Sequence, residues 1–202
     1  MKPVLAILAL ASFAHAGTLV LIPIQDAYIC DCQPDVTNPN GGPSHLYHGR
    51  YTTCYDRSLI QWDLSSIPAG ATVESAVMRL YCISFTGTPS GQPAYYLIDE
   101  AWDELTVTHN TDPGHLATPV ITASWPQPQT WFEVEVTSFV QGWMAGEHPN
   151  FGIYCTSTGC VSTSVPGFWS KDSDHEDLRP QLVVTYSLAG LSESTWGAIK
   201  TE

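Results

Sequence analysis

The side chains best suited to ligand binding in this sequence are aromatic residues outside its most regular segments. Flat aromatic faces can pack against sugar rings, and polar side chains beside them can bond sugar hydroxyl groups. Six such residues lie in expected loops or at expected strand ends: Tyr47, Tyr51, Tyr55, Trp125, Trp131 and Trp169. These six form our candidate carbohydrate-binding set. The competing interpretation is that the rings only cover the edges of the domain.

An acidic run at residues 171–177, KDSDHED, is a candidate metal site. Carboxylate and carbonyl oxygens in such a loop suit Ca²⁺, which is plentiful enough outside cells to fill weak sites. We expect Asp172, Asp174 and Asp177 as the ligands of this cofactor. The spacing does not match an EF-hand, and a solvated charged loop is the alternative.

The six cysteines predict disulfides, because an even number in an exported chain is typical of an oxidising compartment. Cys155 and Cys160 bracket a turn-like segment, so we expect them to join. Cys30 and Cys32 would then pair with Cys54 and Cys82, in an order that the sequence leaves open. The alternative is zinc bound by Cys30, Cys32, His45 and His48, although no CxxC pair is present.

The sequence does not indicate catalysis. Glu133 and Glu135 share one strand face but lie too near each other to resemble the carboxylate pair of a glycosidase. No GxSxG, HExxH or other nucleophile motif occurs. We therefore predict that the protein is not an enzyme.

Charge limits the classes of partner. The formal net charge is −13, whereas nucleic-acid affinity depends on Lys and Arg that neutralise phosphates. The same acidity argues against an anionic membrane surface and is a handicap for a polyanionic polysaccharide unless cations bridge the two. Nucleic acid and membrane insertion are thus not expected.

The two ends of the chain differ from its middle. Residues 1–16 combine Lys2, a short apolar run and Ala14-His15-Ala16, which predicts a secretory signal peptide cleaved before Gly17. The apolar run is too short to span a bilayer. We expect a secreted or cell-surface domain at residues 17–187 and a tail at 188–202.

Short alternating segments separated by turn residues predict the fold. Residues 131–137, 59–64, 76–82 and 182–186 each place apolar side chains on one face, as strands of a sandwich or barrel do. Only residues 137–145 read as a helix before the tail, with Thr137 as N-cap and Gly146 as the stop. One short helix cannot cover a sheet, so the core must lie between sheets.

Several blocks of the sequence also resemble the DNRLRE-domain family of secreted β-sandwich proteins, which are classed with carbohydrate-binding modules. In chain order they include DAYI at 26–29, RSLIQWDLSSIPAGATV at 57–73, WDELTVT at 102–108, VTSFVQGW at 136–143, PNFGI at 149–153 and RPQLVVTY at 179–186. The resemblance implies an all-β, jelly-roll-like antiparallel β-sandwich with one short helix. His109 stands where the family usually has Trp, and the cysteines are additional. The matching positions look like framework, so they do not specify a ligand.

The sequence therefore supports two hypotheses of function. The first is a secreted, non-catalytic module that binds an extracellular or cell-surface polysaccharide. The second is a structural or adhesive cell-surface subunit that self-assembles into a filament or layer through its strand edges or termini.

Overall fold

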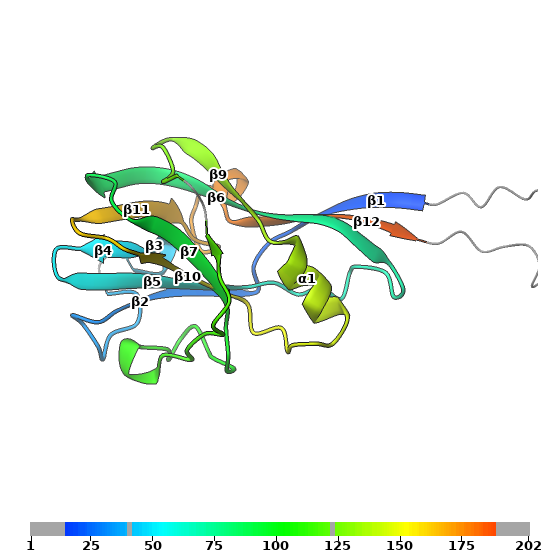
Figure 1. The fold of residues 1–202 in the computed structure, drawn as a ribbon, viewed down its shortest axis with the longest axis horizontal. Helices are drawn as coiled ribbons and strands as arrows, with labels where there is room; N and C mark the ends of the chain where they lie inside the picture. The colour runs from blue at the N-terminus through cyan, green and yellow to red at the C-terminus, as the bar shows by residue number, and fades with distance from the viewer. Residues whose placement is uncertain (1–14, 40–41, 122–123, 189–202) are drawn as a thin grey trace, which may run out of the picture.

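Twelve strands form one continuous hydrogen-bonded sheet that folds over into two packed layers (Figure 1). The computed structural model describes residues 15–39, 42–121 and 124–188. The predicted signal peptide and tail therefore lie almost wholly outside the described residues. Of these two segments, only His15, Ala16 and Leu188 are described, within strands β1 and β12.

The first layer is built around the longest strand, β6. This strand pairs along its length with β12, β9 and β11, and β12 in turn pairs with β1. The members of the layer are β1 (His15–Leu21), β3 (His45–Tyr47), β6 (Thr72–Gly87), β9 (Thr130–Glu135), β11 (Ser164–Trp169) and β12 (Gln181–Leu188). β1 and β12 extend beyond the body of the sandwich, with the first residues of β6 paired to the other edge of β12, and we call this extension the β1–β12 ribbon (Figure 1).

The second layer is built around β5, which pairs with β2, β4 and β10. Its strands are β2 (Gln25–Cys30), β4 (Gly49–Tyr51), β5 (Cys54–Gln61), β7 (Gln92–Leu97), β8 (Val120–Ile121) and β10 (Ile153–Thr158). β4 also contacts β11 at the single register pair Ser164 and Arg50 and so links the two layers.

The main core lies between the layers and follows the predicted alternation. Ala76, Met78, Leu80 and Cys82 of β6 have no measurable exposure, and neither have Ile60 and Trp62 of the facing layer. Val134 and Val136 of the first layer join them, as expected from residues 131–137. The prediction of an all-β sandwich is thereby confirmed.

A second, smaller core lies on the outer face of the second layer. Ala27, Ile29 and Leu59 are buried there against Val107 and Tyr154. Val107 belongs to the long loop after β7, which contains the short helix η2 (His109–Thr111). This loop is therefore packed against the sheet.

The helix forms where the sequence predicts it, as α1 (Thr137–Met144). Thr137 is its first helical residue and not its N-cap, which is Val136; the Thr137 hydroxyl oxygen accepts the backbone N–H of Ala76 instead. Gly146 ends the helix with a φ of 72°, a conformation that glycine adopts without a steric penalty. Two further short helices are η1 (Gly42–Ser44) and η3 (Glu176–Leu178).

Candidate functional site

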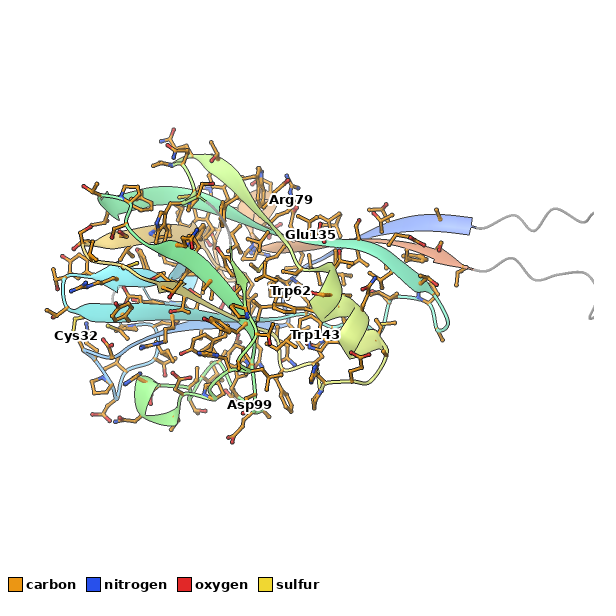
Figure 2. All side chains as sticks on the ribbon, viewed as in Figure 1. Cys32, Trp62, Arg79, Asp99, Glu135 and Trp143 are labelled. Atoms are coloured by element: carbon orange, nitrogen blue, oxygen red, sulfur yellow. A yellow bond between two sulfur atoms is a disulfide. The ribbon has the colours of Figure 1, made fainter. Side chains whose placement is uncertain are left out.

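A hollow lies at the end of the sandwich remote from the β1–β12 ribbon, where Cys32 is labelled in Figure 2. Its volume is about 490 Å³, within the range typical of small-molecule sites. Its walls come from β2, β3, β4, β5, β6 and β11 and from the loops between them. They consist of Tyr28, Cys30, Cys32, Gln33, Tyr47, Tyr51, Thr52, Cys54, Asp56, Thr86 and Val165. We call this hollow the tyrosine pocket.

Strand alternation determines which side chains reach the tyrosine pocket. On β5, Ile60 faces the main core, so Ser58, Asp56 and Cys54 face the same way as the strand approaches the end of the sandwich. Cys30 of β2 pairs in register with Asp56. The pocket is thus an extension of the space between the layers, in which polar residues replace the apolar core.

Asp56 is the acidic side chain among the described residues that line the pocket. It is 7% exposed, and its Oδ1 has no hydrogen-bond partner. Burial raises the pKa of its carboxyl group, while a hydrogen bond from the Cys30 thiol acts in the opposite direction. Burial likewise raises the pKa of the Cys30 thiol. An acceptor oxygen buried without a partner costs free energy that a ligand's donor group can offset.

The pocket also contains two residues of the predicted carbohydrate-binding set. Tyr51 is 51% exposed, whereas Tyr47 is partly buried and packs edge-on against Tyr28 with ring centroids 5.2 Å apart. Burial, reinforced by the Asp56 carboxylate, raises the pKa of the Tyr47 hydroxyl group. The pocket therefore combines aromatic surface with a polar acceptor.

A row of rings continues from Tyr47 along β3 and β11. The His45 ring is stacked near that of Tyr47 at 6.2 Å and lies 4.9 Å from Trp169, which in turn lies 4.5 Å from His175. The register pairs Trp169 with His45, which places both rings on the same face. Trp169 of the predicted set thus joins Tyr47 through His45, a contact that the spacing in the sequence did not reveal.

The other three aromatic candidates lie outside the tyrosine pocket. Trp125 is 7% exposed, and its indole N–H is shared between the carbonyl oxygens of Ser90 and Gly91. Trp131 lies on β9, with the Arg79 guanidinium 4.5 Å from its ring centroid. Tyr55 is the neighbour of Asp56 on β5, so its side chain lies on the other face of that strand, away from the pocket. We leave these three out of the site.

Asp56 was not predicted as a site residue, and Cys30 was expected only as a disulfide partner or a zinc ligand. A signal was nevertheless present. Ile60 faces the core, and every second residue before it, Ser58 and then Asp56, should face the same way. A charged residue on the core face of a strand is unusual unless it has a role.

The cysteines depart from the predicted pairing. Cys32 and Cys54 form a disulfide, one of the pairings left open by the sequence. The expected Cys155–Cys160 disulfide is not formed, because Cys155 faces the main core whereas Cys160 lies past the turn and bonds Ser157. Cys30 and Cys82 are also free thiols.

The zinc alternative is not supported by the positions of its ligands. The sulfur of Cys32 is engaged in the disulfide. His48 is fully buried and stacks on Phe168, whereas His45 contacts Tyr47 and Trp169. The two histidines therefore do not converge.

The three residues expected to bind calcium differ in their surroundings. Asp172 has its Oδ1 2.9 Å from the Lys171 ammonium and belongs to a group of carboxylates with Asp26 and Glu104. Asp174 and Asp177 are exposed, and Asp177 lies in η3. Within the described part of the chain, Asp172 is therefore the one of the three that belongs to a group of three acidic side chains close enough to share a metal ion.

The fold is the β-sandwich that the resemblance implies. The sequence model of carbohydrate-binding module family 96 matches residues 17–186, and this chain belongs to that family. The broader class implied by the resemblance is confirmed, whereas the narrower DNRLRE assignment stays a prediction. A search of curated proteins gives no match. No helix in the described ranges is long and apolar enough to cross a membrane.

Proposed function

We propose that this protein is an exported, non-catalytic module that binds an uncharged polysaccharide in the tyrosine pocket. One observation carries the proposal. A hollow of about 490 Å³ contains the exposed ring of Tyr51, the ring of Tyr47 and the unpartnered acceptor oxygen of Asp56. Membership of a carbohydrate-binding family supports the same conclusion.

The two kinds of wall have different roles in binding. The Tyr51 ring packs against the apolar face of a sugar, because its exposed surface is removed from water when the ring is covered. A sugar hydroxyl group donates to Asp56 Oδ1, whose desolvation is otherwise uncompensated. Aromatic packing thus supplies affinity, and the carboxylate selects for a correctly placed hydroxyl group.

The row of rings from Tyr47 through His45 to Trp169 extends this site along β3 and β11. A polymer that enters the pocket with one unit can therefore contact further rings outside it. This arrangement favours a chain over a single sugar.

The charge of the protein selects among polysaccharides. At a net charge of −13, long-range repulsion disfavours polyanions such as uronic-acid polymers. The carboxylate in the pocket acts in the same direction at short range. We therefore expect neutral glycans to bind more tightly than acidic ones.

The experiment compares binding of the purified chain to neutral and uronic-acid polysaccharides by affinity electrophoresis and calorimetry. Tyr51→Ala is expected to weaken binding about 30-fold, the effect of losing an anchor worth about 2 kcal/mol. Trp131→Ala is the matched control, since it removes a partly exposed ring outside the pocket, and it should leave affinity unchanged.

Three outcomes would overturn the proposal. They are no binding to any glycan by the wild type, equal losses in Tyr51→Ala and Trp131→Ala, and release of reducing sugar during incubation with the bound polysaccharide. Circular dichroism of each variant establishes that the fold is intact.

Export rests on residues 1–16 and on the Cys32–Cys54 disulfide, which is typical of an oxidising compartment. It is tested by sequencing the N-terminus of the protein recovered from the culture medium, which should begin at Gly17. The alternative hypothesis of a self-assembling subunit stays a prediction. It would require sedimentation to show concentration-dependent polymers.

A further inference from the structure

Three carboxylates from distant parts of the sequence meet beside β2. Asp26 lies on β2, Glu104 in the long loop after β7, and Asp172 in the loop after β11. One carboxylate oxygen of each residue lies within 4.8 Å of the other two. None of the three residues lines the tyrosine pocket. The group is therefore a separate feature of the fold.

Asp26 is the buried member of the group. Its residue is only 2% exposed, its Oδ2 accepts the backbone N–H of Lys171 at 2.7 Å, and its own backbone N–H donates to Glu104 Oε2 at 3.0 Å. Its Oδ1 is buried and has no hydrogen-bond partner. A carboxylate oxygen withdrawn from water in this way requires a donor or a cation.

The ammonium group of Lys171 supplies part of the compensating charge. Its Nζ lies 3.1 Å from Glu104 Oε1 and 2.9 Å from Asp172 Oδ1. No contact joins this ammonium to Asp26 Oδ1. Burial raises the pKa of the Asp26 carboxyl group to about 7. Once this group is ionised, three carboxylates and one ammonium leave two negative charges, which is the charge that one divalent cation balances.

The chemistry and the size of the group select the cation. All three ligands are oxygens, which suit hard cations such as Ca²⁺ and not the softer metals that prefer sulfur and nitrogen. Ca²⁺ binds oxygen at about 2.3–2.6 Å, so two ligands on opposite sides of one ion are roughly 5 Å apart. Separations of up to 4.8 Å therefore fit around a single ion.

We propose that Asp26, Glu104 and Asp172 bind one Ca²⁺ ion, with Asp26 Oδ1 as its most buried ligand. The ion links β2 to the long loop after β7 and to the loop after β11. The first of these loops covers the smaller core, where Val107 is buried. Calcium would thus hold the loop on the outer face of the sheet. Of the three ligands expected from the acidic run, this site keeps Asp172, and it has Asp26 and Glu104 in place of Asp174 and Asp177.

The test is thermal unfolding and calorimetric titration of the chain after EDTA treatment and dialysis. CaCl₂ added up to about 10 mM exceeds the dissociation constants of weak extracellular sites. It should raise the melting temperature, and the titration should show one Ca²⁺ ion bound per chain. Asp172→Asn should weaken binding about tenfold or more, because it removes a charged ligand. Asp174→Asn removes the same charge from the same loop and should leave binding unchanged.

A second variant separates calcium binding from a purely internal ion pair. Lys171→Met removes the positive charge nearest the site, so it should tighten Ca²⁺ binding several-fold. If Lys171 is instead the only cation that these carboxylates bind in the native protein, calcium will not shift the melting temperature of the wild type, and the proposal is overturned. Equal effects of Asp172→Asn and Asp174→Asn on affinity would also overturn it.

Discussion

The tyrosine pocket and the face formed by β6 and β9 both present aromatic side chains, but in different surroundings. At the tyrosine pocket, Tyr51 and Tyr47 flank a hollow that contains a buried carboxylate oxygen without a partner. On the face formed by β6 and β9, Trp131 and Tyr81 pack edge-on with ring centroids 5.5 Å apart. There the Arg79 guanidinium covers Trp131, and Glu133 binds the guanidinium at 2.9 Å.

The difference lies in the groups around the rings. On the β9 face Arg79 Nε donates to Glu133 Oε1 and Arg79 Nη1 donates to Gln181 Oε1, so the guanidinium over the Trp131 ring is held by polar partners. In the pocket, by contrast, the Tyr51 ring is exposed and Asp56 Oδ1 has no hydrogen-bond partner. Partly exposed aromatic residues therefore indicate a binding site only where a hollow and an unpartnered polar atom accompany them.

The largest effect on this comparison is expected from disturbing β4, which forms one wall of the pocket. Gly49 has a φ of 140°, and a Cβ atom there would overlap the Ser164 carbonyl oxygen. Gly49→Ala is expected to cost about 4 kcal/mol of unfolding free energy, since backbone strain and overpacking add. Urea denaturation measures the loss.

The matched control for this change is Gly70→Ala. Gly70 also has a positive φ, of 78°, but an added Cβ would meet nothing within 4 Å. The control should cost only about 1 kcal/mol, the strain contribution alone. Equal costs for the two variants would mean that contact between β4 and β11 does not limit stability.

The Cys32–Cys54 disulfide constrains the same end of the sandwich. It closes a loop with a sequence separation of 22, and its loss through joint replacement of both cysteines by Ala should cost about 3 kcal/mol. Sugar affinity should fall as well, because both cysteines line the pocket. Reductant should lower the stability of the wild type by the same amount and leave the double variant unaffected, which serves as the control.

His48 makes the stability of the pocket end depend on pH. Complete burial lowers its pKa to about 3 from an ordinary value of 6.5. The unfolded chain therefore binds this proton before the folded chain does, and stability present above pH 6.5 is lost as the pH falls toward 3. At pH 5 the loss is about 2 kcal/mol, at about 1.4 kcal/mol for each pH unit.

Comparison with His48→Phe isolates this effect. The Phe ring preserves the stacking on Phe168 but does not titrate. The buried Asp56 carboxyl group, whose pKa is raised, affects stability in the opposite sense but is present in both proteins. The difference in unfolding free energy between them should change only below pH 6.5. A constant difference down to pH 4 would show that His48 is not responsible.

The sequence predicted the sandwich because alternation within a strand is local. Ala76, Met78 and Leu80 face the core simply because they lie two residues apart. The pocket depends instead on register and distant contacts. Asp56 meets Cys30 through the pairing of β5 with β2, and Trp125 is withdrawn from the surface by carbonyl groups that precede it by more than thirty residues. No spacing in the sequence encodes either contact.

The smallest effect on stability is expected from a change on the β9 face that uncovers the Trp131 ring. This change tests the same comparison from the face that lies outside the tyrosine pocket. Arg79→Ala removes the guanidinium over Trp131 and its ion pair with Glu133, both of which are partly exposed. Such contacts contribute at most about 1 kcal/mol to stability. The exposed Trp131 ring should still bind no glycan, because neither a hollow nor an unpartnered buried acceptor accompanies it. Calorimetry on the double variant Arg79→Ala with Tyr51→Ala provides the decisive measurement, since any affinity restored there would mean that aromatic exposure alone is sufficient.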